Sequence, residues 1–177
     1  MKPKFITFFL TIPLLFILND LNAQDLTLEI TSKNKEERKI LTNLDYKKKH
    51  KNIKHRNKEI TEVIQKLKRE GYITNLIDSI TKNKTEHTVY FTLNKKINKV
   101  TLTLNKATRL LVEKKNIIEK NKLTIPFKEV TTLFYQINNR LENKGKSFSK
   151  IKLKDTKIKS DTLFAKLEVL QSKKRII

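Results

Sequence analysis

Two kinds of hydrophobic periodicity alternate along the chain, and each occurs twice in the same order. Apolar residues at every second position, typical of a half-buried strand, occupy residues 26–30 and again residues 100–104. A stripe of apolar residues at helical spacing follows in residues 60–67 and again in residues 134–141. Both copies then end in another alternating run. Equivalent segments are 74 residues apart, which indicates a duplicated module.

The only two glycines, Gly71 and Gly145, keep the same spacing of 74 residues. Each stands a few residues after a helical stripe. Glycine is favoured at that position because it takes up the left-handed backbone conformation that ends many helices. We therefore interpret both glycines as structural helix stops within the duplicated module.

Between these landmarks, each copy predicts the order strand, helix, helix, strand, strand. A short first helix is expected around residues 40–44 in the first copy and within residues 110–118 in the second. Pro126 is expected to open the second helix of the second copy, because proline suits the first turn of a helix. The prediction is an α+β fold with two tandem β-α-α-β-β modules, each a small three-stranded mixed sheet covered by two helices.

The N-terminal residues have the features of an export signal. Lys2 and Lys4 precede an apolar stretch, and Leu21-Asn22-Ala23 offers a cleavage site. We expect a signal peptide at residues 1–23, and therefore a mature chain outside the cytoplasm. An uncleaved N-terminal anchor is the alternative.

The repeat then sets the expected domain bounds. The first module is expected at residues 24–99 and the second at residues 100–173. Residues 174–177 fall where the first strand of the module would recur, so they are expected to begin a third copy.

The formal net charge of +22 changes the list of partners to consider. A basic protein can bind nucleic acid or another polyanion. The excess is nearly all lysine and is spread along every segment, whereas arginine is the better reader of phosphate and guanine. We therefore favour composition bias, and nucleic acid is disfavoured as a partner. An exported lysine-rich protein that binds a polyanion (nucleic acid, lipopolysaccharide or an anionic surface) is the alternative function.

The residues that carry enzyme chemistry form no recognisable catalytic, cofactor-binding or metal-binding motif. The absence of cysteine excludes disulfides, cysteine-ligated zinc and a thiol nucleophile. Two distant glycines cannot build a phosphate-binding loop. His50 and His55 lie in a lysine-rich stretch at a spacing that does not direct both at one metal ion, and we interpret them as solvated. The sequence predicts a non-enzymatic protein without a cofactor.

A helical stripe that ends in glycine before an aromatic residue and a hairpin resembles the POTRA (polypeptide-transport-associated) domain. Ser32 and Asn105 stand where that family often has glycine after the first strand. The residues that carry the resemblance are Ile60, Val63, Ile64 and Leu67 with Gly71-Tyr72-Ile73, and Val130, Leu133, Phe134, Ile137 and Leu141 with Gly145 and Phe148.

The resemblance implies a location in the periplasm, associated with the outer membrane. Such domains form strings ahead of the membrane β-barrel in proteins of the surface-antigen superfamily. They bind unfolded or extended polypeptide clients and periplasmic accessory proteins during outer-membrane protein assembly or secretion. We therefore expect this chain to be the N-terminal part of a longer protein whose barrel is absent from these 177 residues.

Strand addition by an extended client to a sheet edge is the expected mode of binding. The resemblance places the docking edge in the strand after each glycine, at residues 72–80 and 148–153. Three lysines in the second edge are expected to prevent self-aggregation while admitting an acidic or polar client: Lys150, Lys152 and Lys154. The candidate client-binding residues are Tyr72, Ile73, Ile77, Phe148, Ile151 and Leu153.

Overall fold

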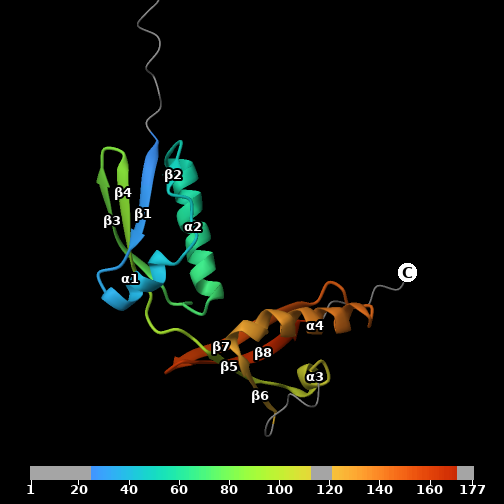
Figure 1. The fold of residues 1–177 in the computed structure, drawn as a ribbon. Coiled ribbons are helices and arrows are strands. Elements are labelled where there is room, and N and C mark those ends of the chain that lie inside the picture. The colour runs from blue at the N-terminus through green and yellow to red at the C-terminus, as the bar shows by residue number, and fades with distance from the viewer. Residues whose placement is uncertain (1–24, 113–120, 171–177) are drawn as a thin grey trace, which may run out of the picture.

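The computed structural model describes residues 25–112 and 121–170. Within these residues the chain forms two four-stranded mixed sheets, each with a long helix packed on one face (Figure 1). The predicted α+β class and the tandem arrangement of two modules are confirmed. The predicted signal peptide at residues 1–23 and the predicted start of a third module at residues 174–177 lie outside the described residues.

The first sheet has the strand order β2-β1-β4-β3. Its first strand runs parallel to its last, and the other neighbours are antiparallel. The elements of this first module are β1 (Leu26–Thr31), α1 (Lys35–Thr42), β2 (Lys49–His50), α2 (Ile53–Arg69), β3 (Leu76–Asn83) and β4 (Glu86–Thr92).

The second sheet repeats this topology in the order β6-β5-β8-β7. Again the first strand is parallel to the last and the other pairs are antiparallel. The elements of this second module are β5 (Lys99–Thr103), α3 (Lys106–Arg109), β6 (Lys122–Pro126), the 3-10 helix η3 (Phe127–Glu129), α4 (Val130–Glu142), β7 (Lys150–Lys159) and β8 (Thr162–Leu170).

Each sheet has one strand more than the three predicted. β2 has only two residues, which is too short to show an alternating pattern. β6 does alternate, since Leu123 and Ile125 are buried between exposed neighbours. The expectation that Pro126 opens the long helix is wrong: Pro126 ends β6 with an extended backbone, φ −56° and ψ 141°. The φ that proline fixes suits an extended residue as well as a first helical turn.

The first helix of the second module begins earlier than predicted. Asn105 and Thr108 cap α3 reciprocally, with each side chain accepting a hydrogen bond from the other's backbone N–H at 2.8 and 2.9 Å. This capping box fixes the helix start directly after β5. The expected helix at residues 110–118 is wrong for residues 110–112, which follow α3, and residues 113–120 lie outside the described residues. Within the described ranges, no helix is long and apolar enough to cross a bilayer.

Both glycines lie in the same helix-ending motif. Gly71 and Gly145 have positive φ angles of 100° and 70°. The N–H that follows each glycine donates to a helical carbonyl five residues earlier, at 2.9 Å in both modules: Tyr72 to Leu67, and Lys146 to Leu141. This is the Schellman pattern, so the interpretation as helix stops agrees with the backbone.

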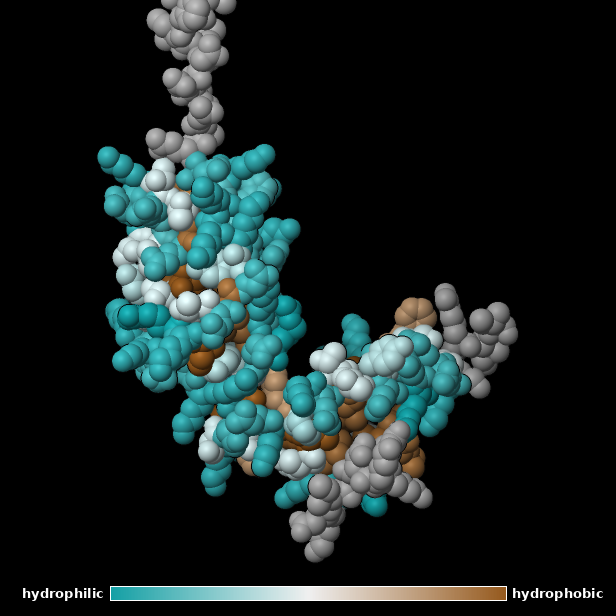
Figure 2. Space-filling model, viewed as in Figure 1, coloured by the Kyte–Doolittle hydropathy of each residue, from teal (hydrophilic) through white to brown (hydrophobic). Residues whose placement is uncertain are grey.

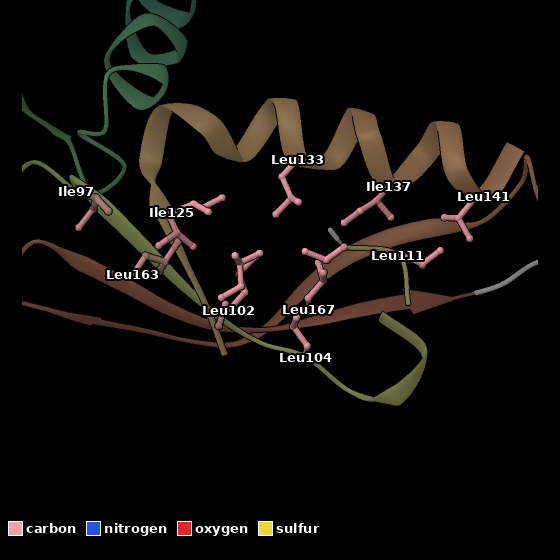
Figure 3. Packing of buried hydrophobic residues seen from close by; sticks show 14 residues of the cluster. Ile97, Leu102, Leu104, Leu111, Ile125, Leu133, Ile137, Leu141, Leu163 and Leu167 are labelled. Carbon is pink, nitrogen blue, oxygen red and sulfur yellow. The ribbon is translucent and has the colours of Figure 1, made fainter. Parts of the chain in front are cut away.

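Each module encloses its own hydrophobic core between sheet and helix. In the second module, α4 directs Leu133, Ile137 and Leu141 toward Leu102 and Leu167 of the sheet (Figure 3). The apolar stripe of α2 packs on the first sheet in the same way. The face seen in Figure 2 is largely hydrophilic, with apolar residues showing in patches.

The two modules meet end to end at an ordered joint (Figure 1). The N–H of Ile97 donates to the carbonyl of Gly71 at 2.9 Å, and the Ile97 side chain is buried in the second core (Figure 3). Ile73 packs against that same core. Lys96 holds its ammonium 5.5 Å from the ring centroid of Tyr72, a cation–π contact across the joint. Backbone and side chains together therefore connect the modules.

Candidate functional site

The candidate site consists of the two long sheet edges, β3 and β7. Each sheet has two edge strands, and β3 and β7 occupy equivalent edges. All residues of β3 are exposed, and most residues of β7 are. An edge strand leaves a row of N–H and C=O groups without a partner strand, which is a template for adding another strand.

Three of the six predicted client-binding residues lie in these edge strands. Ile77 belongs to β3, and Ile151 and Leu153 belong to β7. Their side chains face the core side of the sheet: Ile77 lies opposite buried Phe91. Partly buried Ile151 and Leu153 pack against the second core.

The other three predicted residues precede the strands. Tyr72 is buried in the first core, and Ile73 packs on the second module. The predicted edge at residues 72–80 is therefore wrong in its first four residues, because these form a turn beside the joint and β3 begins only at Leu76. Phe148 is exposed but stands two residues before β7.

A β-bulge interrupts each edge. The register of β3 shifts between Ile77 and Ser79, and that of β7 shifts between Lys154 and Lys157. In β7 the bulge contains Asp155, whose φ is 52°. Bulges limit the length of regular edge that a partner strand can follow.

Charge distinguishes the two edges. In β7 the polar positions are predominantly lysine. One carboxylate, Asp155, lies among them, and a second, Glu168, lies on the neighbouring β8. Lys166 donates to Asp155 at 2.8 Å, and this hydrogen bond, followed by the lysine charge, lowers the pKa of Asp155. The same pairing raises the pKa of Lys166. The second ion pair joins Lys154 to Glu168, also at 2.8 Å.

The histidines do not form a metal site in the described residues, where no group of three potential ligands lies together. The interpretation of His50 as solvated is wrong, since only 3% of its surface is exposed and its Nε2 lies 2.8 Å from the carbonyl oxygen of Lys47. His55 is exposed. His87 is buried in β4, where Arg56 from α2 contacts its Nδ1.

Sequence reasoning missed Ile97, Arg56 and the hollow at the joint. That hollow is lined by residues of both modules, among them Arg69, Lys96 and Phe127. Ile97 is a single apolar residue between two lysines and an asparagine, and this isolated apolar position could have indicated a buried residue between the modules. Arg56 falls on the apolar stripe of α2, four residues before Ile60, which was the signal for its burial.

This arrangement of two helices on a small mixed sheet, repeated in tandem, is the POTRA fold. A structure of POTRA domains 3–5 of BamA from Haemophilus influenzae superposes with a TM-score of 0.52 at 12% identity, covering 86% of this chain and 69% of that chain. The predicted resemblance is therefore confirmed at the level of the fold.

Two further solved structures show the same kind of likeness at lower superposition scores. POTRA domains 1–2 of the periplasmic domain of Omp85 from Anabaena give a TM-score of 0.38 at 8% identity, over 86% of this chain and 97% of that one. BamA from Haemophilus ducreyi lacking POTRA domains 1–3 gives 0.44 at 12% identity, over 85% of this chain and 29% of that one. No protein-family model and no curated protein sequence matches the chain.

Proposed function

We propose that this chain is a non-enzymatic periplasmic module that binds extended polypeptide segments, or accessory proteins, by strand addition at β3 and β7. The process it serves is the assembly or secretion of outer-membrane proteins. The observation that carries the proposal is the pair of long, equivalent sheet edges without a partner strand among the described residues. The POTRA fold and the export signal expected at residues 1–23 support it.

Strand addition fits these edges because it uses backbone groups and makes little demand on client sequence. The client strand continues the sheet beside β7, with alternate side chains reaching the partly buried Ile151 and Leu153. On β3 the equivalent apolar contacts are Ile77 and Ile80, which are 37% and 38% exposed. Both edges thus combine a backbone that has no partner strand among the described residues with apolar side chains on the core face of the sheet.

Site-specific photocrosslinking tests this proposal. A photoreactive residue at position 80 or 152 should crosslink a urea-denatured outer-membrane porin that is diluted into the protein solution. The same group at Tyr135, which is 66% exposed on α4, is the matched control and should not crosslink.

Proline substitutions identify the backbone as the binding element. Ile151→Pro and Lys152→Pro remove N–H groups that point to opposite sides of β7. One variant should weaken the contact with β8. The other should keep its unfolding temperature and lose the crosslink from a photoreactive residue at position 154 of β7, while the crosslink from position 80 of β3 persists. Crosslinking that persists along β7 in both variants contradicts strand addition at this edge.

A further inference from the structure

We propose that the β7 edge selects extended segments with carboxylates at every second position. This inference rests on the proposed strand addition and specifies the chemistry of the partner. Its basis is a row of lysines on one face of the edge strand: Lys150, Lys152, Lys154, Lys157 and Lys159.

The cross-strand register places these lysines on the sheet face that points away from α4. Lys152 lies opposite Glu168, whereas Leu153 lies opposite Leu167, which is buried in the core. Directly opposite residues of an antiparallel pair share a face, and successive residues alternate between faces. The lysines therefore line the outer rim of the sheet, and the apolar residues between them face the core.

Most of this charge has no ion-pair partner among the described residues. Lys154 pairs with Glu168 at 2.8 Å. For Lys150 and Lys152, no carboxylate of the described residues forms an ion pair. The rim therefore presents positive charge that a partner strand can neutralise.

The equivalent edge of the first module lacks this charge. The outer face of β3 carries Ser79, Thr81 and Asn83, each of them exposed and uncharged. The one lysine of the strand, Lys82, lies on the other face, opposite buried His87. The two edge strands occupy equivalent positions in their sheets and are similarly exposed, so they differ mainly in side-chain charge.

The shape of the edge defines the pattern of the partner. A strand added beside β7 alternates its side chains between the two faces. Carboxylates on the outer face lie beside Lys150, Lys152 and Lys154, and apolar residues between them contact Ile151 and Leu153. The bulge after Lys154 ends the regular ladder. The structure therefore favours an acidic–apolar–acidic–apolar–acidic segment.

Binding of synthetic peptides tests this pattern. A labelled peptide with the core Asp-Val-Asp-Val-Asp should bind the full chain more tightly than an isomer with its three aspartates contiguous. The variant K150Q/K152Q/K154Q should bind the alternating peptide about tenfold more weakly, since each opposite-charge pair across strands adds a modest increment. An Asn-Val-Asn-Val-Asn peptide should bind the wild type and this variant equally.

The matched control removes the same charge elsewhere. K47Q/K48Q/K51Q neutralises three exposed lysines of the first module and should retain the affinity for the alternating peptide. An equal loss in this control, or equal binding of the two isomers, would assign the effect to net charge and overturn the inference. Competition by duplex DNA or heparin as strong as that by the peptide would assign the rim to polyanions and also overturn it.

Failure of this inference is distinguishable from failure of the proposed function. If the lysine variant binds every peptide as the wild type does while a β7 proline variant loses all of them, strand addition stands and the acidic preference is refuted. In that case the lysines act only against self-association, and the lysine variant should aggregate. If neither proline variant affects peptide binding, strand addition at β7 itself is refuted.

Discussion

Arg56 and His87 form a buried polar pair inside the first module. Arg56 on α2 is 3% exposed and His87 on β4 is 5% exposed. The guanidinium contacts Nδ1 of His87 and donates to the side-chain oxygen of Asn57, at 2.7 Å from Nη2. A guanidinium can only donate, so Nδ1 accepts and the imidazole is neutral in the folded protein.

This pair predicts that the first module loses stability as the pH falls. Burial lowers the pKa of His87, and the charges of Arg56 and Lys82 lower it further. In the unfolded chain, His87 therefore binds a proton at about pH 6.5, whereas in the folded module it stays neutral at that pH. The free energy of unfolding should decline below that pH, by no more than about 1.4 kcal/mol per pH unit for one proton.

Chemical denaturation at a series of pH values measures this effect. His87→Gln keeps an oxygen that can accept a hydrogen bond from Arg56 and removes the titrating group. The free energy of unfolding of this variant should therefore vary less between pH 7.5 and pH 5 than that of the wild type, by the contribution of about one proton. His55→Gln, at an exposed position, should retain the wild-type dependence. An unchanged slope in His87→Gln would refute the prediction.

At the scale of single elements, the ends of α2 and α4 differ in what their glycines contact. A Cβ at Gly71 would lie 2.5 Å from the carbonyl oxygen of Ile97, in addition to the strain of its positive φ. Gly145 shares the positive φ. Gly145→Ala should therefore destabilise the second module by about 1–2 kcal/mol, the cost of a left-handed residue.

Gly71→Ala should cost more, because the backbone at Ile97 must also move. Thermal unfolding of the two variants gives the comparison. Equal losses of stability would show that the approach of Ile97 imposes no constraint. Altered amide shifts around residues 96–98 in Gly71→Ala, and not in Gly145→Ala, would locate the added strain at the joint.

The elements that the sequence predicted are those with long, regular patterns. The alternation in β1, β4, β5 and β8 and the stripes of α2 and α4 span enough residues to identify strand or helix. β2 has too few residues to show an alternating pattern. β6 was missed because its last residue, Pro126, was interpreted as the start of the following helix.

The remaining errors concern contacts between distant residues. Tyr72 and Ile73 look like strand residues because they are apolar and follow a helix stop, but they pack in the cores on either side of the joint. Likewise, burial of His50 depends on neighbours that the local sequence does not reveal. The predicted edges therefore include Ile77, Ile151 and Leu153, which lie in β3 and β7, but both predicted edges begin before the strands do.

At the scale of the whole molecule, the joint fixes one module on the other through several elements. Asn98 illustrates this: its carbonyl accepts from Phe127 N–H at 2.8 Å, and its N–H donates to the Asp161 carbonyl at 2.8 Å. With Ile97 buried beside it, the connecting segment is built into the second module. The first module is in turn held through Gly71.

This joint predicts a narrow distribution of distances between the modules. The chain has no cysteine, so Lys54→Cys and Tyr135→Cys allow spin labels to be placed on α2 and α4. Pulsed electron spin resonance should give one narrow distance in the wild-type background. Ile97→Ala should broaden it, because the anchor in the second core is truncated.

Leu133→Ala provides the matched control, since it truncates the same core within α4. Both variants should lose about 2–5 kcal/mol of stability in the second module. Only the Ile97 variant should broaden the distance. Equal broadening in both would attribute the change to a weakened core.

The parallel pairing at the centre of each sheet also determines when the protein can fold. Thr27, near the start of the first sheet, pairs with Glu86, and Lys99 pairs with Thr162 in the second. β1 and β5 can pair early with β2 and β6, but neither has its parallel neighbour until almost the whole module has been synthesised. Because synthesis runs from the N-terminus, each module therefore stays an open chain until its last strand has been made. The parallel pairing therefore makes the folding of each module depend on contacts distant in sequence.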